Sequence, residues 1–210
     1  MTARPDSERH EMHWKRLDQP ATEHATLTRS ADGWELVGLV NGRDAAAGEY
    51  VLRYVVRVDD RWVTRTAEIE GTVGASPVRL RLTHDDATGV WTRNGTVVPE
   101  LEGCTDVDLG FTPSTNTLPI RRLGLGVGAA ATVYAAWLRF PDLTLEELEQ
   151  RYIHEEPHRY HYESGGGLFQ ADLEVDASGL VTRYGQYWVA ERAGARPMEA
   201  SAGFASGPAA

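Results

Sequence analysis

Residues 104–123, with the sequence CTDVDLGFTPSTNTLPIRRL, combine a short strand pattern with a dense run of polar side chains. Asp106 and Asp108 alternate with three apolar residues, Val107, Leu109 and Phe111. Successive side chains of a strand point to opposite faces, so both aspartates should share one face and the apolar residues the other. The stretch therefore begins with a predicted strand that has one polar and one apolar face.

The segment between Pro113 and Pro119 is predicted to be an ordered loop rather than a helix interior. It contains short polar side chains, including Asn116, that hydrogen-bond to nearby backbone, and two prolines bracket it. Arg121 and Arg122 follow directly, and a guanidinium that pairs with an aspartate is the simplest network here. Such a pair can fix a loop to a sheet edge or hold a ligand, and the sequence leaves both open.

The rest of the chain reads mainly as strands joined by tight turns. Residues 50–58, YVLRYVVRV, place Tyr50, Leu52, Tyr54, Val56 and Val58 on one face of a long strand. Further strand patterns occupy residues 24–29, 34–40, 62–70, 77–83, 90–93, 96–98, 132–140, 159–163, 168–175 and 180–192. Successive hairpins of this kind indicate an antiparallel meander.

Residues 141–152 form the best helix candidate. Thr144 can cap this helix, two glutamates lie in its first turn, and Leu145, Leu148 and Tyr152 form an apolar stripe. The predicted fold class is therefore mostly β: a single antiparallel curved sheet, a β-roll or half-barrel, with one or two helices. We expect a flexible arm over residues 1–11, the β-roll domain over 12–192 and a disordered tail over 193–210.

The composition excludes several classes of protein. The chain has 210 residues, enough for one sizeable domain, and a net charge of −10, which argues against a nucleic-acid partner. It has one cysteine, no run long enough for an integral membrane segment and no apolar region typical of a signal peptide near its N-terminus. We therefore expect a cytoplasmic protein.

Two groups of histidines are candidate metal ligands. His10 and His13 have a spacing that would suit a metal if they lay on a helix. His154, His158 and His161 lie close together with Glu155 and Glu156, but Pro157 interrupts them and the spacing matches no standard site. We predict no metal site and no cofactor.

The sequence resembles a family of uncharacterised bacterial proteins that are named for glycolipid binding. The family pattern is an Asp-x-Asp strand followed by the run from Thr112 to Leu123. Further matching positions follow in order over about residues 11–192: Trp137, Pro141-Asp142-Leu143, Gln150, Tyr152, Asp176, Gly179-Leu180-Val181 and Tyr184. The resemblance implies a single-domain β-roll, similar to periplasmic carriers of lipoproteins, with an apolar cavity. It supplies no catalytic residue.

Two functions remain open from the sequence. The first is a binding protein that holds a small amphiphilic lipid or glycolipid in an apolar cavity, with the polar head group at its mouth. The ligand-binding residues predicted for it are Asp106, Asp108, Asn116, Arg121, Arg122 and Trp137. The alternative is a hydrolase that acts on a glycolipid or related molecule, with Asp106 and Asp108 as acid and base. We favour the binding protein and predict no catalytic residue.

Overall fold

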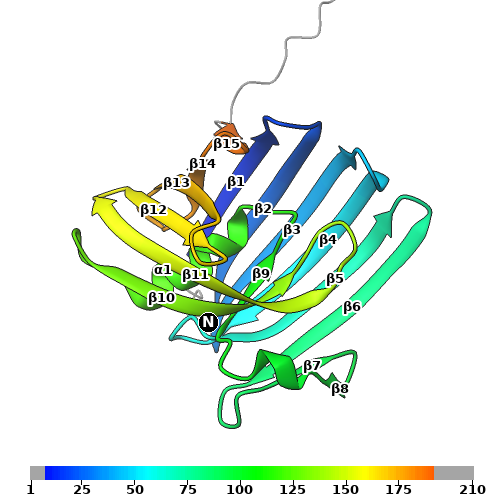
Figure 1. Ribbon diagram of the computed structural model, residues 1–210, viewed down its shortest axis with the longest axis horizontal. Coiled ribbons are helices and arrows are strands. Elements are labelled where there is room, and N and C mark those ends of the chain that lie inside the picture. The colour runs from blue at the N-terminus through cyan, green and yellow to red at the C-terminus, as the bar shows by residue number, and fades with distance from the viewer. Residues whose placement is uncertain (1–7, 192–210) are drawn as a thin grey trace, which may run out of the picture.

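The computed structural model describes residues 8–191, and its strands form one continuous open sheet (Figure 1). The strand order is β8-β7-β6-β5-β4-β3-β2-β1-β15-β14-β13-β12-β11-β10-β9. Neighbouring strands are antiparallel, apart from the parallel pair β9 and β10. The predicted fold class, a mostly β protein with one curved sheet, is confirmed.

The strands occupy most of the described chain. Their bounds are β1 Arg9–Arg16, β2 Ala21–Ser30, β3 Gly33–Asp44, β4 Gly48–Val58, β5 Thr64–Val73, β6 Ser76–Asp85, β7 Val90–Arg93, β8 Thr96–Val97, β9 Asp106–Leu109, β10 Ala130–Leu138, β11 Leu145–Glu156, β12 Arg159–Ser164, β13 Phe169–Val175, β14 Val181–Tyr184 and β15 Trp188–Glu191. The helical elements are the 3-10 turns η1 Pro99–Leu101 and η2 Ser114–Asn116 and the α-helix α1 Thr117–Leu123.

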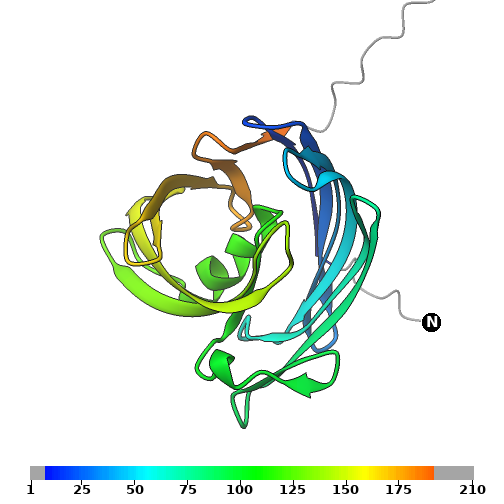
Figure 2. The same ribbon diagram turned by 45° about the vertical axis from the view of Figure 1, so that its right-hand side comes forward.

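The sheet has two parts that curve differently. We call β1–β8 the N-terminal wall and β9–β15 the C-terminal roll. Figure 2 shows the wall as a broad curved surface and the roll as a tighter curl that encloses α1. The two parts are joined where β1 pairs with β15, while β8 and β9 are the two edge strands.

The inner face of the wall follows the alternation predicted for residues 50–58. Tyr50, Leu52, Tyr54, Val56 and Val58 are all buried in the main core. The tyrosine rings need space on the neighbouring strand β3: a Cβ on Gly38 would lie 2.2 Å from Tyr54 Cζ, and one on Gly42 would lie 2.5 Å from Tyr50 Cζ. Both positions therefore need glycine, because any side chain there would collide with the tyrosine ring that covers it.

Residues 112–123 connect the wall to the roll. Thr112 and Ser114 hydrogen-bond to side chains of β2 and β4, whereas Asn116 accepts a hydrogen bond from Tyr152 on β11. This segment therefore lies between the two parts and makes hydrogen bonds to both.

The loop predicted for this segment is wrong, because it is helical. Pro113 precedes η2, and Pro119 is the third residue of α1. The first N–H groups of a helix have no partner within the helix, so a proline at this position costs no hydrogen bond. The helix ends at Gly124, whose φ of 52° is left-handed and whose N–H bonds to Ile120 O. Short polar residues and prolines suit the first turns of a helix as well as a loop.

The helix predicted over residues 141–152 is also wrong. The chain turns at residues 141–144 and then forms β11, which pairs with β10 from Leu145 to Ile153 and with β12 from Gln150 to Glu156. Gln150, Tyr152 and His154 are buried at every second position, the period of a strand. Pairing on both sides outweighs the modest helix preference of the glutamates and leucines.

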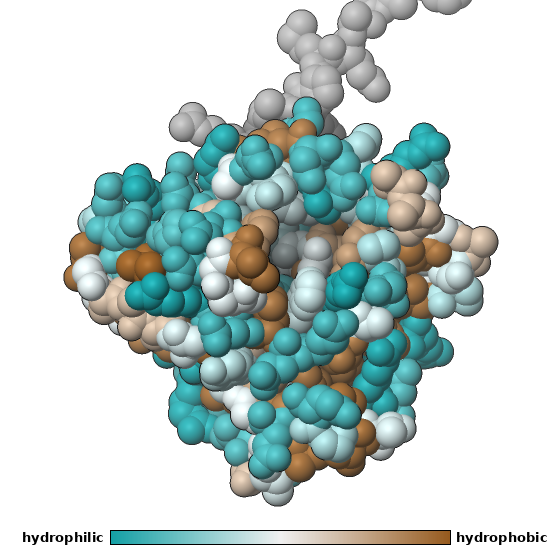
Figure 3. Space-filling view, in the orientation of Figure 1, coloured by the Kyte–Doolittle hydropathy of each residue, from teal (hydrophilic) through white to brown (hydrophobic). Residues whose placement is uncertain are grey.

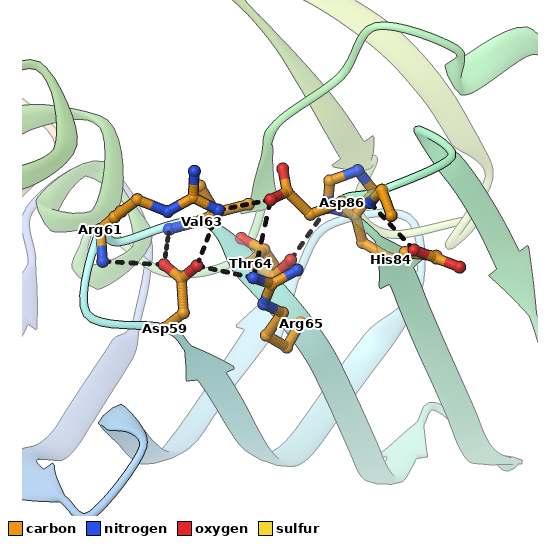
Figure 4. Close-up of polar contacts among 9 residues, drawn as sticks. Asp59, Arg61, Val63, Thr64, Arg65, His84 and Asp86 are labelled. Atoms are coloured by element: carbon orange, nitrogen blue, oxygen red, sulfur yellow. Dashed lines mark hydrogen bonds and ion pairs between the residues drawn. The ribbon is translucent and has the colours of Figure 1, made fainter.

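Trp62 was expected in a strand but lies in the turn between β4 and β5, with a positive φ of 67°. Figure 4 shows the polar network that holds this turn. Asp59 accepts hydrogen bonds from the N–H groups of Arg61 and Val63, and its carboxylate pairs with Arg65 at 2.7 Å. The turn thereby holds Trp62 against Trp34, with 5.1 Å between the two rings.

The outer face of the wall carries arginines that pair with glutamates on neighbouring strands. Arg57 pairs with Glu35 at 2.9 Å, and Arg81 pairs with Glu68 at 3.0 Å. Figure 3 shows the face seen in Figure 1 as largely hydrophilic, with hydrophobic residues near a central recess. Within residues 8–191, no helix has the length and apolar character needed to cross a membrane.

Most of the expected N-terminal arm and all of the expected tail lie outside the described residues, because the structure describes neither residues 1–7 nor residues 192–210. β1 starts at Arg9, so the last three residues assigned to the arm are part of the sheet.

Candidate functional site

A cavity of about 310 Å³ lies inside the C-terminal roll. Every strand of the roll contributes residues to the cavity lining, which also includes Arg16 of β1, Thr112 and Asn116. Its lining residues are Arg16, Asp108, Gly110, Thr112, Asn116, Trp137, Phe140, Leu148, Tyr162, Ser164, Phe169, Tyr184, Tyr187 and Trp188. The volume falls near the lower end of the range for small-molecule sites.

Aromatic rings form one side of this cavity. Phe169 contacts Tyr184 and Tyr187, with ring centroids 6.1 and 5.6 Å apart, and Tyr162 lies 6.0 Å from Tyr184. The edge-to-face geometry of several of these pairs is a favourable arrangement for aromatic rings. Phe169, Tyr184, Tyr187 and Trp137 are only partly buried, although they face the inside of the roll. They present ring surface to whatever enters.

A chain of hydrogen bonds forms the polar side. Gln150 Nε2 donates to Asp108 at 2.6 Å. The hydroxyl of Tyr152 donates to Asn116 Oδ1 at 2.9 Å and lies 3.3 Å from Gln150 Oε1. Burial raises the pKa of Asp108 to about 6, and the hydrogen bonds from Gln150 and Thr115 lower it in part. Asp108 is therefore held by neutral partners and can accept or, when protonated, donate a hydrogen bond at the cavity wall.

Asp106 has a different partner. Arg122 of α1 binds it with two hydrogen bonds, Nε to Oδ1 at 2.9 Å and Nη2 to Oδ2 at 2.5 Å. Burial raises the pKa of Asp106 above its ordinary value, and the Arg122 guanidinium opposes that shift. The carboxylate is 1 % exposed and Arg122 is 18 % exposed, so the pair fixes α1 to β9.

Arg121 lies on the other side of α1. Its guanidinium carbon is 4.8 Å from the Trp62 ring centroid and 5.9 Å from that of Trp34, a cation–π arrangement. Its side-chain stem packs where a Cβ on Gly179 would lie, 2.9 Å from Arg121 Cδ. Of the six predicted binding residues, the structure places Asp108, Asn116 and Trp137 on the cavity wall. It places Asp106, Arg121 and Arg122 in contacts elsewhere.

Sequence reasoning missed two residues of this polar system. Gln150 lies in the predicted helix 141–152, where the structure has β11. The predicted strand 24–29 begins just after Glu23, which faces inward on β2 between Ala21 and Ala25. An acid at an inward position of an apolar strand face is the signal that could have identified Glu23.

The Glu23 carboxyl is 2 % exposed and lies behind the cavity wall. It accepts hydrogen bonds from the hydroxyls of Tyr54 and Thr112, the latter at 2.7 Å, and Ser114 lies 2.6 Å from the Tyr54 hydroxyl. Burial raises the pKa of Glu23 to about 7, although these hydroxyls lower it in part. Its second oxygen has no hydrogen-bond partner among the described residues.

Neither group of candidate histidines from the sequence forms a metal site in the structure. His10 and His13 lie on β1, where residues three apart face opposite sides of the sheet, so they cannot form a helical pair. His154 Nδ1 contacts Leu125 O at 2.6 Å, and His161 contacts Asp172 at 3.1 Å on the next strand. The second group therefore does not converge.

Comparison with known proteins identifies the family. The sequence pattern of a family described as "Putative glycolipid-binding" matches residues 11–190. The chain belongs to this glycolipid-binding family. The Asp-x-Asp strand, the segment that contains α1 and nearly the whole sheet fall within the matched region.

A solved structure supports the same relationship. The chain is similar to a DUF1089 family protein from Pseudomonas aeruginosa, known from a crystal structure at 1.80 Å resolution. The two sequences are 29% identical, and the superposition has a TM-score of 0.67. It covers 88% of this chain and 91% of the other. A search of curated proteins finds no match.

Proposed function

We propose that the protein binds one neutral glycolipid, with the sugar head group in the cavity of the C-terminal roll. The observation that carries the proposal is the cavity lining, which combines seven aromatic side chains with the polar groups of half-buried Asp108 and buried Asn116. Aromatic rings cover the apolar face of a sugar, and carboxylate and amide groups hydrogen-bond to its hydroxyls. The family description points to the same ligand class.

The charge of the lining favours a neutral head group. Arg16 is the one basic residue among the residues that line the cavity, and its Nε already donates to Asp18 at 2.7 Å. Asp108 would repel an anionic group whenever it is ionised. The residues that line the cavity therefore offer no free guanidinium or ammonium group to a phosphate or sulfate.

The hydrocarbon part of the ligand would extend out of the cavity. A volume of about 310 Å³ suits a head group better than a whole glycolipid. Ser164 and Phe169 line the cavity, and the turn between them exposes Leu168, which is 95% accessible. We assign the alkyl chain to this turn, where an apolar side chain is available at the cavity edge.

Hydrolysis is less well supported by the same geometry. Glycoside hydrolysis commonly uses two carboxyl groups on either side of the scissile bond. Asp108 is the one carboxyl group among the lining residues, and Asp106 is bound by Arg122. The substitution Asp108→Asn separates the two functions, because a binding protein should keep its fold and weaken at most moderately, whereas a hydrolase should lose turnover.

The test is a fluorescence titration of the full chain with short-chain alkyl glucosides below their micelle concentration. We expect saturable quenching or enhancement of tryptophan emission, because Trp137 and Trp188 line the cavity. Tyr184→Leu should weaken binding at least tenfold. Tyr134→Leu, on the outer face of β10 with 42 % exposure, is the matched control and should bind as the original protein does.

The same titration tests the charge and chain assignments. Alkyl phosphates of equal length should bind more weakly than the glucosides. The gain in affinity with each added methylene should shrink in Leu168→Ser. Absence of saturable binding by any alkyl glucoside, or equal loss in Tyr134→Leu and Tyr184→Leu, would contradict the proposal.

A further inference from the structure

A second cluster of ligand-type side chains lies on the outer face of the sheet, away from the cavity. His13 of β1 is directly opposite His24 of β2, and Glu11 lies two residues before His13 on the same strand face. Ligand atoms of Glu11, His13 and His24 all lie within 4.8 Å of one another. The sequence gives no hint of this group, because His24 is brought to His13 by strand pairing.

The three side chains point toward one place. The two imidazole rings are stacked, with centroids 4.2 Å apart and an interplanar angle of 8°. Their Nε2 atoms approach the same carboxylate oxygen of Glu11, at 2.7 Å from His24 and 3.6 Å from His13. Tetrahedral zinc with bonds of about 2.1 Å holds its ligand atoms roughly 3.4 Å apart. Because the two rings are nearly parallel, at least one imidazole must turn about its side-chain torsions before both Nε2 lone pairs can meet one ion.

The cluster is open to an ion from solution. The three side chains are between 43% and 47% exposed, so no buried group must move to admit a metal. Glu191 lies opposite His13 on the other neighbouring strand, β15, and so occupies the same face of the sheet.

We propose that Glu11, His13 and His24 bind a divalent transition-metal ion, with zinc as the best match to two imidazoles and a carboxylate. Water or Glu191 would supply the fourth ligand. The ion would link β1 to β2 beside the β1–β15 pair that joins the wall to the roll. Imidazole nitrogen and carboxylate oxygen are ordinary zinc ligands, whereas calcium and magnesium prefer oxygen alone. This site is independent of the proposed glycolipid cavity.

The experiment is isothermal titration calorimetry of the full chain, free of any histidine tag, with zinc chloride. We expect one zinc ion per chain and no heat from magnesium or calcium at the same concentration. His24→Ala and Glu11→Gln should each weaken zinc binding at least tenfold. Zinc should also raise the melting temperature of the original protein but not of His24→Ala.

His161→Ala is the matched control. His161 is a partly exposed histidine with a carboxylate at 3.1 Å, but no second histidine lies opposite it in the β11–β12 or β12–β13 pairing. This variant should bind zinc as the original protein does. Failure of the original protein to bind zinc, or unchanged zinc affinity in folded His24→Ala and Glu11→Gln, would overturn the proposal.

Discussion

The N-terminal wall and the C-terminal roll use aromatic side chains in different ways. In the wall, Tyr50, Tyr54 and Trp91 are no more than 1 % exposed and pack against a filled core. In the roll, Phe169 and Tyr184 also face inward but remain partly exposed, because they line a cavity. One continuous sheet therefore builds a closed core in one part and an open one in the other.

Carboxyl groups in the two parts also have different surroundings. Glu23 of the wall does not line the cavity, but it accepts a hydrogen bond from the hydroxyl of Thr112, which does. Asp108 of the roll lies on the cavity wall itself. Burial raises the pKa of both groups. The comparison teaches that burial of an acid does not identify a binding residue unless the acid also faces empty space.

The largest expected effect comes from breaking the pair that fixes α1 inside the roll. Asp106→Asn removes the negative charge that holds Arg122, leaving a largely buried guanidinium without its partner. Loss of one member of such a pair costs about 3 kcal/mol, near the low end for buried pairs because Arg122 is partly exposed. The melting temperature should fall by roughly 6–12 °C.

Thermal unfolding followed by circular dichroism measures this effect. The control is Asp172→Asn on β13, whose side chain is 58 % exposed, and it should leave the melting temperature nearly unchanged. Equal stability of Asp106→Asn and the original protein would show that the pair does not support the roll.

The second effect is a pH dependence that originates in the wall. The pKa of Glu23 is raised to about 7 in the folded protein from an ordinary value of 4.5. Between these values the unfolded chain releases a proton that the folded protein keeps, so stability falls as the pH rises. From pH 5 to pH 8 this contribution should decrease by about 2.5 kcal/mol.

Glu23→Gln removes this contribution, because the amide does not titrate. Urea unfolding at pH 5 and pH 8 should show the variant gaining stability relative to the original protein as the pH rises. Glu35→Gln, on the exposed face of β3, should show no such trend. If the difference in unfolding free energy between Glu23→Gln and the original protein is the same at pH 5 and pH 8, the raised pKa of Glu23 is contradicted.

A smaller effect tests how tightly the wall is packed. In Gly38→Ala the new Cβ would lie 2.2 Å from Tyr54 Cζ, so the ring must move. Overpacking of this kind costs about 2 kcal/mol. Gly126→Ala is the control, since a Cβ there meets no atom within 4 Å. Chemical denaturation should separate the two variants, and a neutral Gly38→Ala would show that the wall has spare volume.

The smallest effect on stability is expected in the roll. Tyr184→Leu enlarges a cavity that already exists and removes a ring that is only partly buried. It should cost less than about 1.5 kcal/mol, although it should weaken binding of alkyl glucosides at least tenfold. Differential scanning fluorimetry with and without glucoside measures both quantities. A large loss of stability would mean that the roll is packed as the wall is.

Local patterns in the sequence predict much of the sheet. The alternation at residues 50–58 correctly gives the buried face of β4, because a long strand with one face in the core shows a period of two, broken here only by buried Val55. The aspartates of β9 are also correctly placed opposite Val107, which packs in the main core. Both features depend only on neighbouring residues.

Features set by distant contacts could not be predicted in this way. The segment that forms β11 has helix-forming residues, and only pairing with β10 and β12 makes it a strand. The contact between Thr112 and Glu23 joins residues 89 positions apart, and no spacing in the sequence indicates it. The division between Asp108 at the cavity and Asp106 in an ion pair depends on where α1 packs.

The most direct test of the central claim is native mass spectrometry of the protein purified from the organism that makes it. The account predicts an added mass on the folded protein that organic extraction identifies as a sugar-bearing lipid. The added mass should be absent or strongly reduced in Tyr184→Leu and retained in Tyr134→Leu. A protein of bare mass, together with an unchanged melting temperature across a panel of glycolipids, would contradict the account.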